Sequence, residues 1–531
     1  MNRPQHHFSK HKHLIASLAL ISLAACGGGG GGGGGFVPPP GGGGGGWTPG
    51  VFLNASTFAA QCAAPRAGQF PDVQGTSTDE NNFLRSYSDD TYLWYDEIID
   101  RDPALHQTAA YFDLLKTDAT TPSGQAKDKF HFTFPTDEWI ALSQSGSSAG
   151  YGAEWVLLAA APPREILVAF TEPGTPATTP PANLARGAEV LFVDNVDVIN
   201  GNTQADVDTL NAAFFPSQAG QTYDFTVRDL DGTQRSFSMT SIDVVSTPVQ
   251  NASTIPTASG AVGYLLFNAH IATAESGLVN AVNQLQAAGI TDLVIDLRYN
   301  GGGFLDIASE FAYMIAGPVP TAGQTFENLT FNDKHPSTNP ITGQPLSPTP
   351  FHTTSQGFDI GAGQPLPTLN LSRVFVLSGP NTCSASESIM NSLLGVDVEV
   401  FQIGSTTCGK PYGFFATDNC GTTYFTIQFK GENAKGFGDY TDGFSAANQT
   451  GTVGTIVPGC SVADDFTHAL GDPLEGRLAA ALTYRDSQTC PLPASGVKAP
   501  GQFETSVGTD LSAVDGLVRR NVWQNNRIIR R

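Results

Sequence analysis

The spacing of apolar residues changes along the chain and predicts different elements in different segments. Between about residues 55 and 140, apolar and aromatic side chains recur at helical spacing, most clearly in 79–100 and 102–117. Asp102-Pro103 is typical of a helix start. We therefore expect a small helical N-terminal domain over 55–140, with the aromatic residues in its core.

The segment 145–245 instead shows short β-rich runs. The runs 150–160, 164–172, 188–198 and 223–240 are separated by Gly, Pro and Asp turns. The order of a strand, a Pro-rich connection, a short helix and a strand over 166–198 resembles the middle of a PDZ domain. This chain has Gly187-Ala188 where that family has Gly-Asp. The resemblance implies a PDZ-like domain that binds extended chain ends at a sheet edge. The alternative is a β-rich domain that only supports the structure.

Strands and helices alternate between residues 260 and 485. The expected strands are 261–270, 290–300, 371–380 and 398–404, and the expected helices are 273–289, 304–317 and 384–395. This order predicts a mostly parallel sheet with right-handed crossovers. We expect a multidomain α+β protein with an α/β domain over 255–490 and a C-terminal tail over 491–531. The stretch 317–370 is expected to be a long loop.

The start of the chain indicates export. A basic stretch precedes an apolar run, Leu14–Ala25, which is shorter than the roughly 18 residues needed to span a bilayer. Residues 1–26 are therefore expected to be a secretory signal. Leu23-Ala24-Ala25-Cys26 resembles the lipobox of bacterial lipoproteins, which implies lipidation of Cys26 and a membrane partner through the lipid. Residues 27–50 are expected to be a Gly-rich tether, and the protein to lie in the cell envelope at the outer membrane.

Charge and cysteine content narrow the possible functions. The net charge of −22 disfavours binding to nucleic acid. Without Cys26, six cysteines remain, and they allow 15 pairings that the sequence does not distinguish. Cys408 and Cys420 bracket Lys410, so either could fix that loop. No Cys/His spacing suggests a metal site, and no cofactor is expected.

Candidate chemistry concentrates at the ends of the expected strands, where α/β folds place their sites. Ser384 begins a Ser-x-x-Glu capping box with Glu387. The same helix start would stabilise an oxyanion formed at Ser384. Ser386, Ser388 and Ser392 are interpreted as helix residues. The candidate bases are Lys410, if burial keeps it neutral, and a histidine. Outside the expected signal, the histidines are His106, His131, His270, His335, His352 and His468.

A second strand end carries the glycine run Gly301–Gly303. Glycines allow backbone N–H groups to approach a ligand closely, and the run lacks the spacing of dinucleotide or P-loop motifs. Asp296 and Arg298, on the strand before it, are expected to pair and hold the turn.

Together these stretches resemble the catalytic domain of the S41 serine peptidases, the C-terminal processing peptidases. The matching segments are 263–270, 292–303, 374–387 and 403–413, in family order after the PDZ-like segment. The resemblance implies Ser384 as nucleophile, Lys410 as base, and Gly302 and Ala385 as oxyanion donors. Phe414 stands near where the family has a glutamine that orients the lysine. Gln428 is a candidate replacement, and Glu387 is a candidate supporting residue.

The expected function is a serine endopeptidase that cleaves unstructured or C-terminal protein segments in the cell envelope. Its partners would be protein or peptide substrates. Two alternatives remain open: a catalytically inactive, peptide-binding surface lipoprotein, and an enzyme of the same fold that uses a histidine as base.

Overall fold

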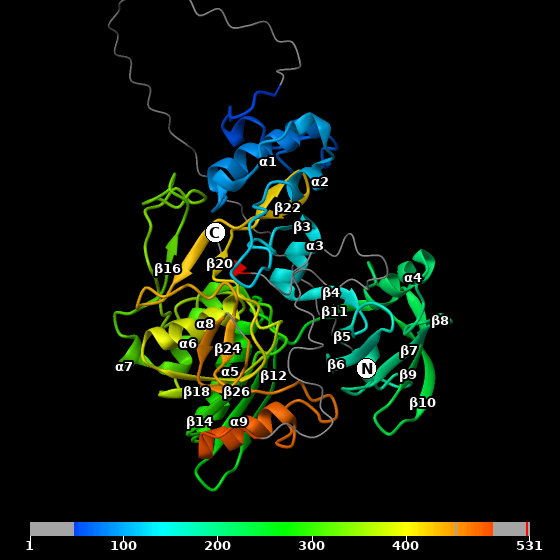
Figure 1. The fold of residues 1–531 in the computed structure, drawn as a ribbon, viewed down its shortest axis with the longest axis vertical. Helices are drawn as coiled ribbons and strands as arrows, with labels where there is room; N and C mark the ends of the chain where they lie inside the picture. The colour runs from blue at the N-terminus through cyan, green and yellow to red at the C-terminus, as the bar shows by residue number, and fades with distance from the viewer. Residues whose placement is uncertain (1–46, 452–453, 492–526, 529–531) are drawn as a thin grey trace, which may run out of the picture. The chain divides into compact units, whose positions relative to one another are not determined.

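A six-stranded sheet organises the part of the chain expected to be α/β (Figure 1). Its strand order is β12-β13-β14-β18-β19-β26, and every neighbouring pair except β12–β13 is parallel. The strands are β12 (Val249–Ile255), β13 (Val262–Phe267), β14 (Asp292–Asp296), β18 (Arg373–Ser378), β19 (Glu399–Gly404) and β26 (Gly459–Ser461). The predicted mostly parallel sheet is confirmed.

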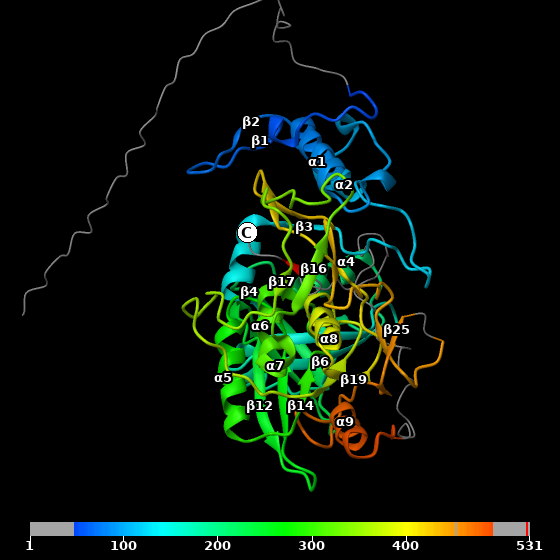
Figure 2. The same ribbon diagram turned by 90° about the vertical axis from the view of Figure 1, so that its left-hand side faces the viewer.

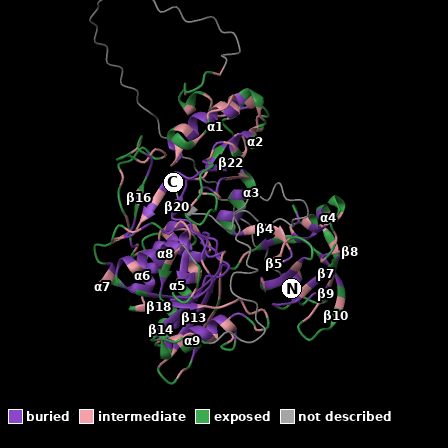
Figure 3. Cartoon of the chain, viewed as in Figure 1, coloured by how far each residue is buried: buried purple, intermediate pink, exposed green. Residues whose placement is uncertain are grey.

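Helices pack on both faces of this sheet. They are α5 (Ala274–Ala287), α6 (Leu305–Ala316), α8 (Ala385–Gly395) and α9 (Gly476–Ser487). Leu265 and Phe267 of β13 belong to the core that includes α5, α6 and α8, which Figure 2 shows beside one another. Tyr264 and Leu266, the alternate residues, belong to the core that includes α9. This alternation is the period of two expected for a strand buried on both faces, and the sheet, α6 and α8 are largely buried in Figure 3.

The β-rich segment forms a separate sheet of order β10-β9-β7-β6-β5, with β8 paired to β7. Its elements are β5 (Ala153–Ala159), β6 (Glu165–Thr171), η5 (Pro176–Thr178), β7 (Glu189–Val193), β8 (Val196–Asp197), α4 (Gln204–Phe214), β9 (Thr222–Arg228) and β10 (Gln234–Thr240). It has its own core, centred on residues such as Trp155 and Phe225. Val156 and Leu167 lie outside that core and pack with β13, β14 and α9 residues. β4 (Ser147–Gly150) pairs with β11 (Ile242–Val245).

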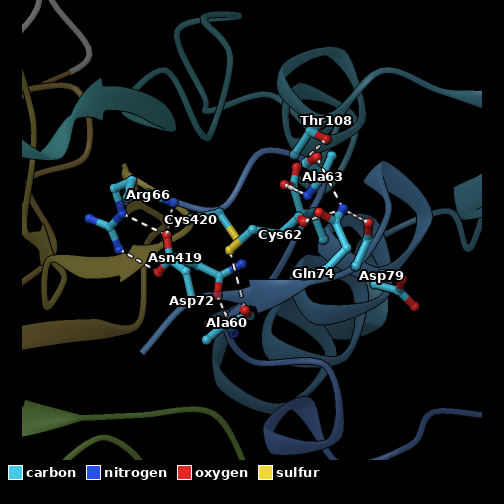
Figure 4. Close-up of a disulfide and its surroundings, with 12 residues drawn as sticks. Ala60, Cys62, Ala63, Arg66, Asp72, Gln74, Asp79, Thr108, Asn419 and Cys420 are labelled. Carbon is cyan, nitrogen blue, oxygen red and sulfur yellow. Dashed lines mark hydrogen bonds and ion pairs between the residues drawn. A yellow bond between two sulfur atoms is a disulfide. The ribbon is translucent and has the colours of Figure 1, made fainter. Parts of the chain in front are cut away.

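The N-terminal region is helical in part, but it shares its packing with later residues. It contains η1 (Ala55–Thr57), β1 (Gln61–Cys62), β2 (Val73–Gln74), α1 (Ser77–Thr91), η2 (Tyr95–Glu97), η3 (Pro103–Leu105), α2 (Thr108–Asp113), β3 (Phe132–Pro135), α3 (Thr136–Ile140) and η4 (Ala141–Ser145). β3 pairs with β22 (Thr422–Phe425). A disulfide between Cys62 and Cys420 fixes β1 to the turn before β22 (Figure 4).

The remaining elements complete the region around the sheet. They are β15 (Gly303–Phe304), α7 (Pro318–Thr321), β16 (Thr325–Thr330), β17 (Thr349–Pro350), β20 (Tyr412–Gly413), β21 (Thr417–Asn419), β23 (Phe429–Glu432), β24 (Phe444–Ala446), β25 (Thr455–Val457) and β27 (Arg527–Ile528). The expected loop 317–370 therefore contains a short helix and two strands. Other cysteines form the disulfides Cys383–Cys408 and Cys460–Cys490.

The computed structural model describes residues 47–451, 454–491 and 527–528. The expected signal, Cys26 and the tether up to residue 46 lie outside the described residues, as does the tail apart from residues 491, 527 and 528. Within the described residues, helices that are both long and apolar enough to cross a bilayer are absent.

Candidate active site

Ser384 lies in the turn that connects β18 to α8. Its backbone has φ +61° and ψ −115°, a conformation that non-glycine residues adopt only when the surroundings enforce it. The side chain has no exposed surface, and its hydroxyl has no hydrogen-bond partner among the described residues. Only half of the expected capping box therefore forms: the Ser384 N–H donates to Glu387 Oε2 at 2.9 Å, while the hydroxyl remains outside it.

Glu387 connects the Ser384 turn to the loop after β19. Its Oε2 accepts the N–H groups of Ser384 and Lys410, at 2.9 and 2.8 Å. Its Oε1 accepts the Thr407 hydroxyl at 2.5 Å and the Gly409 N–H at 2.8 Å. Burial raises the pKa of Glu387, and these donors oppose that shift. One carboxylate thus binds the backbones of both predicted catalytic residues.

A disulfide reinforces this connection. Cys383 precedes Ser384, Cys408 lies two residues before Lys410, and their Cα atoms are 5.1 Å apart. Because the Ser384 and Lys410 nitrogens bind the same Glu387 oxygen, they lie within two hydrogen-bond lengths of each other. The structure therefore brings together the two residues that the sequence predicted as nucleophile and base.

Lys410 is completely buried in an aromatic environment. Its Nζ lies 4.2 Å from the ring centroid of Phe414 and 4.8 Å from that of Phe130. Burial lowers the pKa of Lys410 well below its usual value, and the carboxylates of Asp128 and Glu387 oppose this only in part. This shift favours the neutral amine, which is the form that a general base requires.

Phe414, which replaces the expected glutamine, is thus a direct neighbour of Lys410. Gln428, the candidate replacement, binds elsewhere: its Oε1 accepts the Phe415 N–H at 2.7 Å, and its Nε2 donates to the Tyr87 hydroxyl. These contacts do not support the expectation that Gln428 orients Lys410. Asp128 and Phe130 were missed because they lie about 280 residues away in the sequence, and only a pairing such as β3–β22 brings that region to the site.

The two expected oxyanion donors differ in their surroundings. Ala385 is the first residue of α8, so its N–H is one of the four that lack a partner within the helix. The Gly302 N–H instead donates to Asn300 Oδ1 at 2.9 Å. Gly302 therefore cannot act as an oxyanion donor in this conformation unless that bond breaks. Its φ of +102° explains the need for glycine there.

His270 lies beside the glycine run and was not singled out by the sequence. The backbone N–H of His270 donates to the Gly302 carbonyl at 2.9 Å. In its ring, Nδ1 lies 3.0 Å from Asn300 Oδ1. Because an amide oxygen can only accept, Nδ1 carries the proton. Nε2 is buried without a partner among the described residues. Burial lowers the pKa of His270 to about 3, so the ring is neutral.

The expected Asp296–Arg298 pair is present at 2.9 Å, and it belongs to a larger buried network. Arg298 also contacts Glu475 at 2.7 Å and Asp464 at 2.5 Å. These carboxylates come from the region of α9. Their ion pairs with Arg298 hold the strand end that precedes the glycine run.

Among the described residues, Cys383, Glu387 and Cys408 are spaced as metal ligands would be. The two sulfurs are joined in a disulfide, so they offer no thiolate. This group does not fit a metal ion.

Comparisons with known proteins relate part of this chain to a peptidase family. Residues 261–413 match the model of peptidase family S41. The carboxyl-terminal-processing protease of Picosynechococcus sp. is 27% identical over 228 residues, which cover 42% of this chain and 52% of that protein. The chain thus matches about half the length of this curated relative.

One solved structure has a similar fold. A putative S41 protease from Bacteroides fragilis is 22% identical, with a TM-score of 0.56 over 80% of this chain and 100% of that one. A photosystem II D1 C-terminal processing protease is 17% identical, with a TM-score of 0.40 over 70% of this chain and 92% of that one.

Proposed function

We propose that this chain, a serine-type peptidase related to family S41, is an endopeptidase that cleaves unstructured or C-terminal segments of envelope proteins through Ser384 and Lys410. The observation on which this depends most is the shared anchoring of the two residues on Glu387. The two residues held in this way are a serine with a strained backbone, whose hydroxyl has no hydrogen-bond partner among the described residues, and a buried lysine with a lowered pKa.

The proposed reaction begins with neutral Lys410. Its Nζ accepts the proton of the Ser384 hydroxyl as Oγ bonds to the carbonyl carbon of the scissile peptide. The Ala385 N–H and the positive end of α8 stabilise the oxyanion that forms. Protonated Lys410 then donates its proton to the leaving amine as the C–N bond breaks. Neutral Lys410 then takes a proton from water as the water oxygen bonds to the acyl carbon, and it returns that proton to Ser384 Oγ as the ester bond breaks.

The site is closed in this conformation. Ser384 and Lys410 have no exposed surface, and Asn300 holds the Gly302 N–H. Substrate binding must therefore move part of the surrounding chain, and release of Gly302 from Asn300 would complete the oxyanion site. This opening would distinguish an inactive resting state from a working one.

The parts outside the site are assigned roles by the same proposal. β5 is an edge strand of its sheet, as a PDZ-like peptide-binding strand must be. It would present a loosely folded chain to the peptidase. A lipid on Cys26 and the tether would hold the enzyme in the cell envelope, at the outer membrane.

Hydrolysis of a loosely folded protein such as β-casein tests the mechanism. We expect Ser384→Ala and Lys410→Met to lose activity by at least about a thousandfold, since each removes a member of the reacting pair. Circular dichroism would verify that both variants are folded. Parent-like cleavage by both folded variants would refute the Ser-Lys assignment.

A histidine base is the alternative that a specific observation favours, because His270 Nε2 is buried and unpartnered beside the glycine run. His270→Gln retains a similar shape without the basic ring. If His270→Gln loses cleavage and Lys410→Met retains it, the base is His270. Labelling of Ser384 by a fluorophosphonate, located by mass spectrometry, would exclude an inactive peptide-binding protein.

A further inference from the structure

We propose that Glu275 and Glu310 form a clamp on the loop 353–364, that the clamp closes by binding one proton, and that pH thereby sets how firmly the glycine run is held. The two carboxyls lie outside the proposed catalytic pair. The inference goes beyond the proposed function, and a conformational measurement tests it without any hydrolysis.

Glu275, the second residue of α5, accepts hydrogen bonds from five consecutive backbone N–H groups of the loop. Its Oε1 accepts those of Gln356 and Gly357 at 2.7 and 2.9 Å. Its Oε2 accepts those of residues 358–360 at 2.8, 3.1 and 3.2 Å. Glu275 has no exposed surface, and burial alone would raise its pKa. The loop N–H groups and a hydrogen bond with Glu310 instead hold that pKa below its usual value, so Glu275 binds the loop as a carboxylate.

Glu310, in the middle of α6, faces the same loop. It also has no exposed surface, and its Oε1 accepts the Gln356 N–H at 2.7 Å. Because Glu275 Oε1 accepts the same N–H, the two carboxyls lie within two hydrogen-bond lengths of each other. Glu310 Oε2 is buried and accepts no hydrogen bond from the described residues. Burial, and then the charge of Glu275, raise the pKa of Glu310 to about 9, so the second carboxyl keeps its proton at neutral pH.

The charged groups around the pair, among the described residues, do not neutralise it. Asp306, one turn before Glu310 on α6, raises the pKa of Glu310 further. Asp306 is itself 2.9 Å from His352 Nε2. Asp359, in the loop, accepts the Ser276 N–H at 2.8 Å. A proton is therefore what prevents two negative charges from standing side by side in the buried site.

The loop reaches the glycine run through Phe358. The centroid of its ring lies 4.9 Å from that of Phe304, a buried residue that follows Gly303 in β15. The Phe304 N–H donates to the His270 carbonyl at 2.8 Å, and the backbone N–H of His270 donates to the Gly302 carbonyl at 2.9 Å. Release of the loop would therefore uncover Phe304 and weaken the bonds that hold both ends of this short segment.

Proton linkage gives the direction of the pH effect. With the loop closed, Glu310 keeps its proton up to about pH 9. With the loop open, water reaches Glu310 and its pKa returns toward the usual value of 4.5. Closure therefore takes up a proton, and the closed form loses stability as the pH rises between these two values and stays level above them. The limit is a roughly tenfold fall in the ratio of closed to open molecules per pH unit.

Amide hydrogen exchange at pH 6, 7 and 8 tests the clamp, with rates expressed as protection factors so that the intrinsic effect of pH is removed. We expect the protection of amides 356–360 in the parent to fall at least about tenfold from pH 6 to pH 8. Glu310→Gln, whose amide has the shape of the protonated carboxyl, should keep this protection constant within about twofold. Asp306→Asn, on the same helix, is the matched control and should retain most of the fall. Protection that does not fall in the parent, or that falls equally in Glu310→Gln, would overturn the clamp.

Phe358→Ala tests the connection to the glycine run. The variant keeps the backbone N–H groups that Glu275 binds, so amides 356–360 should retain the pH dependence of the parent. The amides of Gly302 and Phe304 should lose about tenfold in protection at pH 6, because the ring that covers Phe304 is gone. Parent-like protection of these two amides would show that the clamp holds the loop alone, and would refute control of the glycine run. Since exchange does not depend on turnover, a chain that hydrolyses nothing would reject the proposed function and leave this inference standing or falling on its own result.

Discussion

At the scale of single residues, Lys410 connects catalysis with stability. Burial lowers the pKa of Lys410 well below its usual value. The proposed mechanism requires Lys410 to be neutral in the folded chain at neutral pH, whereas in the unfolded chain it is protonated. The unfolded chain therefore binds one more proton than the folded chain, and stability increases as the pH rises from the lowered pKa toward the usual lysine value. Lys410 thus costs stability at neutral pH, and we infer that its function is the reason it is tolerated.

Replacement of Lys410 by methionine should therefore abolish activity and raise the melting temperature at pH 7 by about 2 °C or more. The difference in melting temperature between Lys410→Met and the parent should shrink as the pH approaches 10, because a neutral buried lysine costs the parent less stability there. Lys410→Arg is the matched control, because a guanidinium cannot become neutral there. It should be inactive and less stable than the parent. Calorimetry from pH 6 to 10 measures these effects, and a lower melting temperature for Lys410→Met at pH 7 would contradict burial in the neutral form.

The sequence singled out candidate site residues more readily than their neighbours. Ser384, Lys410 and Glu387 were singled out by their places after strands or at a helix start, together with the resemblance to the S41 peptidases. The neighbours of Lys410 could not be found this way, because Phe130 and Asp128 reach it only through tertiary pairing. Local sequence pattern also does not reveal which acceptor a backbone N–H binds. The hydrogen bond from the Gly302 N–H to Asn300 Oδ1 was therefore not predicted.

At the scale of elements, the site depends on two loops, 379–384 after β18 and 405–410 after β19. The parallel neighbours β18 and β19 bring both loops to the same edge of the sheet. Cys383–Cys408 then joins them covalently beside the proposed catalytic residues. The pattern of alternating strands and helices predicted this edge, but the choice among 15 cysteine pairings needed the three-dimensional structure. The β3–β22 pairing was likewise missed, since its strands are far apart in sequence.

Two disulfides offer a matched comparison at this scale. Cys383–Cys408 and Cys460–Cys490 close loops of similar length, with sequence separations of 25 and 30. Replacing either pair by serines should cost a similar free energy of unfolding, about 3–4 kcal/mol by loop entropy. Only the Cys383→Ser/Cys408→Ser variant should also lose kcat, because its loops carry Ser384 and Lys410. Urea unfolding and casein hydrolysis measure the two effects, and equal loss of kcat in both variants would argue against a positioning role.

At the scale of the whole molecule, Arg186 connects the β-rich segment to residues beside the six-stranded sheet. Its guanidinium donates to Asp464 at 2.7 Å and to the Tyr299 hydroxyl at 2.7 Å. Burial alone would raise the pKa of Asp464, but Arg186 and Arg298 outweigh it and hold that pKa below its usual range. Since Arg298 directly precedes Tyr299 and the glycine run, Asp464 links the β-rich segment to the strand end that carries the glycine run.

Removing the arginine should therefore weaken both the docking and the site. Arg186→Met leaves Asp464 buried with one cation fewer, which should lower the free energy of unfolding by about 3 kcal/mol, as for other broken buried pairs. The matched control is Arg228→Met, which removes a partly exposed pair with Glu189 in the same sheet and should cost less than about 1 kcal/mol.

Amide hydrogen exchange would show which segments Arg186→Met destabilises. Faster exchange in both β5–β6 and residues 297–303 of Arg186→Met, with parent-like exchange in Arg228→Met, is the expected result, because Asp464 contacts both Arg186 and Arg298. Faster exchange confined to β5–β6 would mean that the two segments are docked but not coupled. The proposed PDZ-like segment would then deliver substrate without influencing residues 297–303, and the opening of the proposed site would have to depend on residues nearer to Ser384.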